Sequence, residues 1–294
     1  MLAVYDNSDD DRAPLILVYG PAGIGKTSLA ITSPNCLYIP VLPEAPPRSA
    51  KCKRLDAAPD FGTLMSHMRA LYKEQHGFST IVIDSLDALE PFVIKETCRR
   101  MGWPDIETPS YGKGWVANDE TWRMLISGVD ALRRNRGIMI IWTALAEATN
   151  HEDPGTPPYK KYSLRLHKRA EKLVTQAADA VLFINTKTTM KELDTGFNQK
   201  TYVADGGGTR WAFTDARPAF LAKNRFNMPE MIMLDKQNPW ISLSKYITYN
   251  PPAKKAVEPE LPFNGAKPPL TIPADPPPTQ TTIAEDLKGD FIPV

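Results

Sequence analysis

The chain has 294 residues, 42% of them hydrophobic, which suits one large α/β domain with a tail or two small domains. Its formal charge of +1 excludes a global attraction to nucleic acid or membrane, so a polyanion must be bound by a local patch. Three cysteines without the paired spacing of a zinc site, and no apolar run of about 18 residues, predict a cytoplasmic protein with reduced thiols and no membrane contact.

The first predicted element is a buried strand over Leu15–Tyr19, and a glycine-rich turn and a helix follow it. The turn fills every fixed position of the pattern G-x-x-x-x-G-K-[ST], with Gly20, Gly25, Lys26 and Thr27. Glycines let the backbone wrap around a phosphate, and the loop N–H groups and the positive helix end point at the anion. We expect Lys26 to reach the β- and γ-phosphates of ATP and the Thr27 hydroxyl to bind Mg²⁺. The whole predicted nucleotide-binding loop comprises Gly20, Pro21, Ala22, Gly23, Ile24, Gly25, Lys26, Thr27 and Ser28.

Two further apolar runs predict strands of the same sheet. The first spans residues 36–41, and a loop rich in Pro, Lys and Arg follows it over 45–58. A helix is expected from its N-cap Asp60, and Thr80–Asp84 is a β-branched run that ends in a carboxylate. An aspartate at the end of such a strand, after a phosphate loop, has the form of a Walker B residue. We therefore assign Asp84 to the Mg²⁺ shell.

The middle of the chain continues the alternation of helices and strands. We expect helices over 91–101 and 119–136, joined by a loop rich in Gly and Pro, and a buried strand over 138–143. Asp87 and Glu90 are interpreted as caps of the first of these helices. The alternation predicts an α/β fold whose central sheet is mostly parallel and is flanked by helices.

The last part of the domain is less regular. Periodicity is lost over 144–162, and the basic stretch 160–169 leads into a helix and then a strand over 180–185. A polar hairpin is expected within 181–204, with its tip near Asp194. Gly206–Arg210 is interpreted as a flexible turn, not as a second phosphate loop, because no strand and helix flank it.

The composition changes near residue 250. Residues 251–294 hold eleven of the twenty-eight prolines and almost no periodic pattern, which predicts a disordered Pro-rich tail. We therefore divide the chain into a flexible N-terminus (1–13), a folded domain (14–248) and the tail (249–294). The tail ends in acidic residues and an apolar tip, Glu285–Val294. Two interpretations stay open: solubility alone, or a peptide that docks on a partner, since the tip loosely resembles that of bacterial single-strand-binding proteins.

The order of these motifs resembles the phage RecA-like ATP-binding family that includes the Sak-type single-strand-annealing recombinases. The similarity covers about 14–245 and rests on the phosphate loop, Asp84, Tyr111-Gly-Lys-Gly114, the strand 138–143, Ala178-Asp179, and Lys223-Asn-Arg225 before Pro229. It implies a P-loop NTPase with a RecA-like core over 14–248, ATP and Mg²⁺ as cofactors, single-stranded DNA as partner, and a homo-oligomeric ring or filament.

The chain departs from the family at two positions. The strand after the phosphate-loop helix usually ends in an acidic residue that orients the attacking water, and the nearest candidate is Glu44, displaced by about two positions. The sensor strand usually ends in His or Gln near the γ-phosphate, whereas this one ends at Thr143, whose hydroxyl we expect to hydrogen-bond a phosphate less well. Both departures concern the rate of hydrolysis more than nucleotide binding. The resemblance offers Lys223 and Arg225 as cations for the γ-phosphate, from the same or a neighbouring subunit, although a solvated turn stays open.

We expect single-stranded DNA to be bound by the loops after the Walker B helix and after the sensor strand. Stacking faces come from Trp103, Tyr111 and Trp115, and phosphate contacts from Lys113, Lys160, Lys161, Arg165, Lys168 and Arg169. For each of these residues a purely structural role stays open.

The resulting hypothesis is an ATP-binding phage recombination protein that binds single-stranded DNA and promotes annealing or strand pairing, with ATP hydrolysis as a switch. Two alternatives stay open. A P-loop small-molecule kinase would need a lid and an acceptor site, and the sequence has no arginine-rich lid. A nucleotide-dependent adaptor would use its tail to recruit a partner.

Overall fold

The computed structural model describes residues 12–47, 51–153, 156–186, 189–194, 200–205, 208–247 and 249. Its strands are β1 (Leu15–Gly20), β2 (Cys36–Pro40), β3 (Lys53–Arg54), β4 (Thr80–Asp84), β5 (Met139–Asp153), β6 (Thr156–Leu164), β7 (Ala180–Thr186), β8 (Thr189–Asp194), β9 (Lys200–Asp205), β10 (Arg210–Phe213), β11 (Lys223–Asn224) and β12 (Met231–Met233). Its helices are α1 (Lys26–Ile31), α2 (Phe61–Lys73), α3 (Leu86–Met101), α4 (Lys113–Arg136), α5 (Lys168–Ala177) and α6 (Ile241–Ser244).

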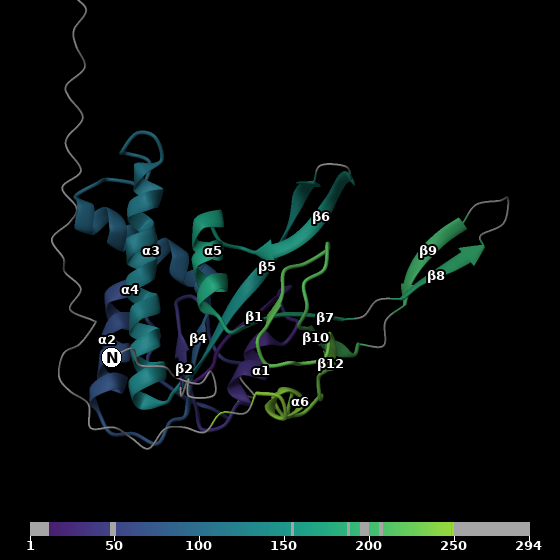
Figure 1. Cartoon of the computed structure of the whole chain (residues 1–294), viewed down its shortest axis with the longest axis horizontal. Helices are drawn as coiled ribbons and strands as arrows, with labels where there is room; N and C mark the ends of the chain where they lie inside the picture. Colours follow the sequence, from purple (N-terminus) through teal and green to yellow (C-terminus); the bar gives the residue numbers. More distant parts are fainter. Residues whose placement is uncertain are drawn as a thin grey trace, which may run out of the picture.

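A mostly parallel sheet forms the centre of the domain (Figure 1). The strand order is β12-β10-β7-β1-β5-β4-β2-β3, in which the strands from β7 to β3 run parallel. β10 pairs antiparallel with β7, and β12 pairs antiparallel with β10. The phosphate-loop strand β1 lies between β5 and β7, and β5 separates it from β4. Because β1, β4 and β2 run parallel, their carboxyl ends lie at the same edge of the sheet. Ligands of open α/β sheets bind at this edge.

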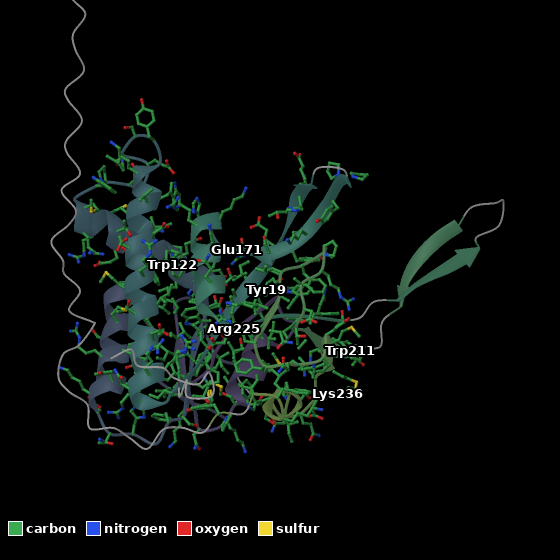
Figure 2. The ribbon with its side chains drawn as sticks, in the orientation of Figure 1. Tyr19, Trp122, Glu171, Trp211, Arg225 and Lys236 are labelled. Atoms are coloured by element: carbon green, nitrogen blue, oxygen red, sulfur yellow. The ribbon has the colours of Figure 1, made fainter. Side chains whose placement is uncertain are left out.

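Side chains alternate between two buried faces, as parallel strands covered on both sides require. Leu15, Leu17 and Tyr19 pack with the helices α2 to α5. Ile16 and Val18 pack with α1 and the C-terminal segment around α6. Trp122 of α4 lies fully buried on the first face (Figure 2). The predicted α/β fold, with helices flanking a mostly parallel sheet, is confirmed.

Two predicted helices begin earlier than expected. The helix predicted from 91 begins at Leu86, after the N-cap Ser85, and the one predicted from 119 begins at Lys113. The interpretation of Asp87 and Glu90 as caps is therefore wrong.

Both carboxylates instead bind other elements. Asp87 accepts from the backbone N–H of Leu145 at 2.8 Å and from Arg165 at 2.9 Å. Glu90 accepts from the backbone N–H of His167 at 2.9 Å. The first turns of α3 are thereby joined to two other elements: to β5 at the point where its pairing with β6 begins, and to the start of α5.

The segment expected to be irregular, 144–162, is mostly a long antiparallel hairpin of β5 and β6 that projects beyond the sheet (Figure 1). Its residues pair from Ala146↔Leu164 to Asp153↔Thr156. The side chains described on its outer part are exposed or half-buried, so the sequence carries no alternation of apolar and polar residues.

The predicted polar hairpin is present as β8 paired with β9. The tip near Asp194 lies partly outside the described residues, as do residues 1–11 and nearly all of the predicted tail, including 285–294. The N-terminal boundary needs a correction, because Ala13 is fully buried and Arg12 pairs with Asp179 at 3.4 Å. Among the described residues, no helix is long and apolar enough to cross a membrane.

A buried ion pair holds the amino-terminal edge of the sheet together. Arg133 of α4 is 0% exposed; its Nη2 donates to Asp179 and its Nε donates to the carbonyl of Ala13 at 2.7 Å. Asp179, just before β7, also accepts from the backbone N–H of Leu15 at 3.0 Å. Burial lowers the pKa of Arg133, and the neighbouring Asp179 opposes that shift. One carboxylate therefore connects the starts of β1 and β7 to α4.

We expect Asp179→Ala to lower the free energy of unfolding by about 3–5 kcal/mol, because it leaves the Arg133 charge buried without its main partner. Urea denaturation followed by circular dichroism measures the loss. Glu230→Ala is the matched control, since it removes one half of the exposed Arg217–Glu230 pair, and should change stability by about 1 kcal/mol or less. Equal effects of the two variants would contradict a structural role for the buried pair.

Candidate functional site

The phosphate loop requires its glycines for two different reasons. Gly23 and Gly25 have φ values of 73° and 100°, which L side chains rarely adopt. Gly20 has no room for a side chain, because a Cβ would lie 2.3 Å from the carbonyl oxygen of Ile184. The sequence pattern thus reflects both backbone conformation and the close approach of β7.

Lys26 is folded back onto the loop. Its Nζ donates to the carbonyls of Gly20 at 3.1 Å and Pro21 at 2.9 Å, and the residue is only 8% exposed. Burial lowers its pKa, and the carboxylates of Asp84, Asp87 and Glu44 oppose that shift. The ammonium group is held at the mouth of the loop by weak carbonyl partners that a phosphate can replace.

Asp84, at the end of β4, is a buried carboxylate bound by three hydroxyl groups. Thr27 Oγ1 donates to its Oδ2 at 2.7 Å, Tyr38 Oη donates to the same oxygen at 3.0 Å, and Thr143 Oγ1 donates to Oδ1. Asp84 is 3% exposed, so these bonds replace most of its hydration. The three donors come from α1, β2 and β5.

Tyr38 is a site residue that was not predicted from the sequence. It lies inside an apolar strand, and a buried tyrosine in such a run gives no sign of whether its hydroxyl serves the core or a site. Burial raises its pKa, and the adjacent carboxylate of Asp84 raises it further, so the phenol stays a donor. The pairing of β2 with β4 brings the Tyr38 hydroxyl to Asp84. In this register Tyr38 lies opposite Val82, two residues before Asp84.

Thr27 and Asp84 fit a magnesium ion that arrives with a nucleotide. Their oxygens lie 2.7 Å apart, and hydroxyl and carboxylate oxygens are the hard ligands that Mg²⁺ prefers. No group of three or more His, Cys, Asp or Glu in the described part of the chain suits a metal by itself. Mg²⁺ usually takes one or two carboxylates and completes its shell with water and phosphate, and it neutralises charge between the β- and γ-phosphates.

Glu44 lies close enough to the cluster to share its electrostatic field despite its displacement in the sequence. Its backbone N–H donates to the carbonyl of Val41 at 2.8 Å, in the turn that follows β2. Burial raises the pKa of Glu44, Asp84 raises it further, and Lys26 and the Ser85 hydroxyl partly oppose the shift.

The Thr143 hydroxyl is directed at Asp84. We expected it to reach a phosphate, but it is fully buried and donates to the carboxylate. Its effect on a bound nucleotide therefore passes through the position of Asp84.

Lys223 and Arg225 lie at the other end of the sheet from the phosphate loop. Asn224 pairs with Ala180, which pairs with Ile16, whereas Gly20 lies four residues further along β1, a rise of about 13 Å. The idea that they serve the γ-phosphate of their own subunit is therefore wrong.

Both cations also have structural partners at that end. Lys223 Nζ donates to three carbonyls at the end of α5, including that of Ala178 at 2.6 Å. Arg225 pairs with Asp179 at 3.4 Å.

The candidate DNA-binding residues fall into two groups. Trp115 stacks on His167 at 3.8 Å and donates to Glu107 at 2.7 Å, Arg165 pairs with Asp87, and Arg169 pairs with Asp119 at 2.6 Å. These three therefore have structural contacts. Lys160 and Lys168 are exposed, Trp103, Lys113 and Lys161 are half-buried, and Tyr111 is 96% exposed.

The segment Tyr111-Gly-Lys-Gly114 forms a tight turn into α4. Tyr111 and Gly112 have φ values of 59° and 67°, and Gly112 is the N-cap of the helix. A Cβ on Gly114 would lie 1.8 Å from the carbonyl oxygen of Ile106, so the loop packs directly on the helix backbone. The turn holds the Tyr111 ring out in solvent.

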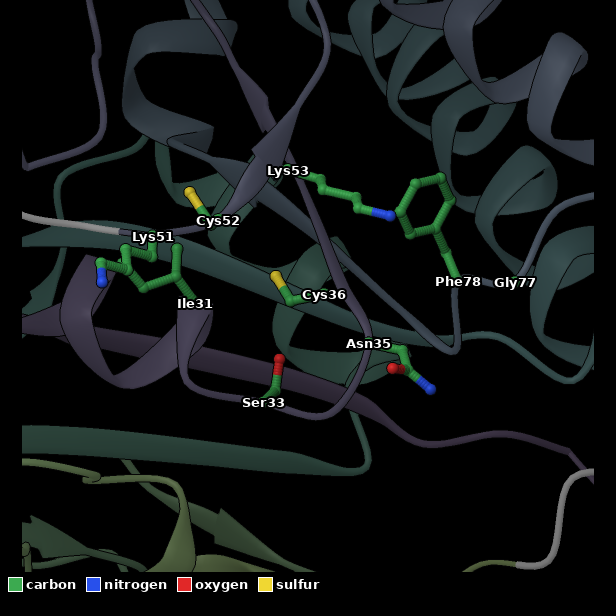
Figure 3. A pocket seen from close by; sticks show the side chains of 9 residues that line it. All are labelled: Ile31, Ser33, Asn35, Cys36, Lys51, Cys52, Lys53, Gly77 and Phe78. Carbon is green, nitrogen blue, oxygen red and sulfur yellow. The ribbon is translucent and has the colours of Figure 1, made fainter.

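A pocket of about 360 Å³ lies at the opposite, amino-terminal edge of β2 and β4 (Figure 3). Its lining includes Cys36, Cys52 and Phe78, and burial raises the pKa of Cys36 to about 12. It is separate from the phosphate site, because Cys36 begins the strand that delivers Tyr38 and Glu44 to the other edge.

The glycine loop, the lysine at its mouth and the aspartate that faces Thr27 define a P-loop ATPase. A model of the AAA domain family AAA_24 matches residues 12–226, which is most of the chain. The chain belongs to this AAA domain family, and the family implies nucleotide binding. No curated protein matches the sequence. Among solved structures, the crystal structure of the RadB recombinase is similar at 16% identity and a TM-score of 0.42, over 77% of this chain and 90% of that one.

We expect Thr143→Val to lower the free energy of unfolding by about 1–3 kcal/mol, because one oxygen of a buried carboxylate loses its donor. ATP affinity should stay near that of the wild type while hydrolysis falls, since Lys26 is untouched and Asp84 is no longer held. Thr149→Val, on the projecting part of the same strand, is the control and should change neither quantity. Calorimetric titration and a phosphate-release assay measure the two effects.

We expect the rate of ATP hydrolysis at saturating nucleotide to rise with pH through a midpoint above the ordinary pKa of a glutamate. The reason is that Glu44 acts as a base only when ionised, and its raised pKa keeps it protonated to a higher pH. Glu44→Gln should hydrolyse slowly and lose this limb of the pH profile. An unchanged profile in that variant would remove Glu44 from the mechanism.

Proposed function

We propose that this P-loop ATPase binds single-stranded DNA and promotes annealing or strand pairing, with ATP hydrolysis as the switch, like the phage recombinases whose motif order it resembles. Lys26 contacts the phosphates, Thr27 and Asp84 hold the Mg²⁺ shell, and Glu44 polarises the attacking water. Positioning and charge stabilisation supply the catalysis.

The observation that carries the proposal is the connection between Asp84 and the candidate DNA-binding loops. Helix α3 starts directly after Asp84, and its Asp87 binds Leu145 and Arg165 at the base of the β5–β6 hairpin. One turn on, Glu90 binds the N–H of His167, whose ring stacks on Trp115 beside the Tyr111 turn. The same short helical segment therefore follows Asp84 in the chain, contacts the base of the hairpin directly, and is connected to the Tyr111 loop through His167.

The outer surfaces of these two loops suit a single strand. The exposed Tyr111 ring offers a stacking face, and Lys160 on β6 and Lys168 on α5 offer exposed charges. Figure 1 shows the α3–α4 loop and the β5–β6 hairpin at the same end of the domain. Stacking on aromatic residues with phosphate contacts to cations is the general mode of single-strand binding, and it tolerates a neutral overall charge.

Homo-oligomerisation belongs to the same proposal. Lys223 and Arg225 lie too far from the phosphate loop to act within one subunit, so a neighbouring subunit would have to receive them. A ring or filament would complete each site with a cation from the next subunit, and the tail would recruit a partner such as a single-strand-binding protein.

The decisive measurement is ATP hydrolysis by the purified protein with and without short single-stranded DNA. We expect stimulation by DNA, loss of both binding and hydrolysis in Lys26→Ala, and retained binding without Mg²⁺-dependent hydrolysis in Asp84→Ala. ATP binding by Lys26→Ala equal to that of the wild type would overturn the site. Hydrolysis indifferent to DNA would favour the adaptor, and phosphoryl transfer to a nucleoside monophosphate would reveal a kinase.

We expect Tyr111→Ala to weaken binding of single-stranded DNA by about 1–3 kcal/mol, the contribution of one stacked base. ATP affinity without DNA should not change, since the ring lies in solvent away from the phosphate loop. Tyr111→Phe keeps the stacking face and serves as the matched control. Fluorescence anisotropy with a labelled oligonucleotide measures the difference, and equal losses in both variants would argue against stacking.

A further inference from the structure

An arginine that the sequence analysis assigned to a flexible turn lies against the phosphate loop. Arg210 begins β10 and pairs with Thr186 at the carboxyl end of β7. A Cβ added to Gly25 would lie 2.2 Å from Arg210 Nη1, so the guanidinium occupies the space where any other residue at position 25 would have a side chain. This arginine therefore reaches the loop on its own subunit, which Lys223 and Arg225 do not.

The guanidinium has only weak partners among the described residues. Nη2 lies 3.4 Å from the carbonyl oxygens of Asp235 and Lys236, at the long end of the range for a hydrogen bond. No carboxylate forms a salt bridge with Arg210 in the described part of the chain, in contrast to the paired arginines at 133, 165 and 169. A half-buried arginine held by two long contacts has donors to spare for an anion.

A cavity of about 400 Å³ opens next to Arg210, within the size range of small-molecule sites. Its lining includes Ser28 and Thr32 of the α1 segment, and Lys236 and Gln237 of the loop after β12. Lys51 adds a third cation, and no acidic residue is among the described lining residues. Figure 2 shows Lys236 and Trp211, the neighbour of Arg210, on the same side of the domain. The charge of the lining suits an anion that extends from the phosphate loop past Ser28.

We propose that Arg210 is a second phosphate-binding cation of this ATPase, acting on its own subunit and contacting the polyphosphate of the nucleotide from the side of Gly25. This inference rests on the nucleotide binding of the proposed function and adds a residue to it. Lys26 contacts the β- and γ-phosphates from the end of the loop, and Arg210 contacts the chain of phosphates where it leaves the loop toward the cavity. The two cations thereby hold the polyphosphate from opposite sides.

The test is equilibrium binding of inorganic tripolyphosphate, ATP and AMP to the full chain. Arg210→Ala should weaken tripolyphosphate and ATP alike, by roughly ten- to a hundredfold, because each loses a charge-assisted hydrogen bond. Arg210→Lys keeps the charge and should recover part of the affinity. Arg217→Ala removes a half-exposed arginine on the next loop and should bind like the wild type.

A second readout separates phosphate contact from a merely structural role. The thermal midpoint of the nucleotide-free Arg210→Ala protein should match the wild type, whereas the rise in midpoint caused by tripolyphosphate should shrink, since ligand stabilisation follows affinity. A lower midpoint without ligand and an unchanged ligand shift would assign Arg210 to folding and overturn the proposal. Unchanged affinity for tripolyphosphate would do the same.

The outcomes also separate this inference from the proposed function. Stimulation of hydrolysis by DNA in the wild type, together with normal tripolyphosphate binding by Arg210→Ala, would leave the function standing and remove the arginine. Weakened tripolyphosphate binding, together with hydrolysis that ignores DNA, would keep Arg210 and remove the recombination function.

Discussion

The functional edge of this domain depends on the hydrogen bonds that hold the buried carboxylate of Asp84. A carboxylate taken out of water is stable only if hydrogen bonds replace its hydration, and here three hydroxyls do so. Tyr38 and Thr143 come from the strands β2 and β5, which pair with β4 on either side, and Thr27 comes from α1, which follows the phosphate loop. The carboxylate that we propose for the Mg²⁺ shell is therefore held in place by two neighbouring strands and by the first turn of α1.

The two edges of the same sheet carry charge for different purposes. At the amino-terminal edge, Asp179 gathers Arg133 and the backbone of Leu15, and the exposed Arg225 joins from outside. Each charge there has an opposite charge beside it, which makes the cluster a structural clamp. At the carboxyl edge, the hydrogen bonds of Lys26 within the described part of the chain go to two carbonyls of the phosphate loop. Lys223 at the amino-terminal edge is held by carbonyls as well, but Lys26 lies at the mouth of the glycine loop, where a phosphate can replace its partners.

The sequence predicted what local pattern determines. The glycines of the phosphate loop, the apolar strands and the Asp60 N-cap follow from backbone sterics and periodicity, which act over a few residues. It did not predict contacts made by register or by tertiary packing. Asp87 and Glu90 are acidic residues near the start of a helix, as capping residues often are, but they bind backbone N–H groups that lie far along the chain. Tyr38 and Arg210 reach the site through strand pairing, and no local pattern marks them. The β5–β6 hairpin escaped detection because its outer part has no buried face.

Under the proposed function, a nearly neutral protein would have to couple a nucleotide to a polyanion through short contacts. With a net charge of +1, the electrostatic potential of the whole molecule contributes little to coupling between distant sites. Such coupling has to pass through packed and hydrogen-bonded groups. The first turn of α3 provides such a connection, because its start is tied to Asp84 and its two carboxylates are tied to the hairpin and to α5. A carboxylate bound to a backbone N–H fixes position more tightly than a long-range charge does. In the proposed mechanism, a movement of Asp84 on loss of the γ-phosphate would therefore reach Leu145 and His167 together through α3.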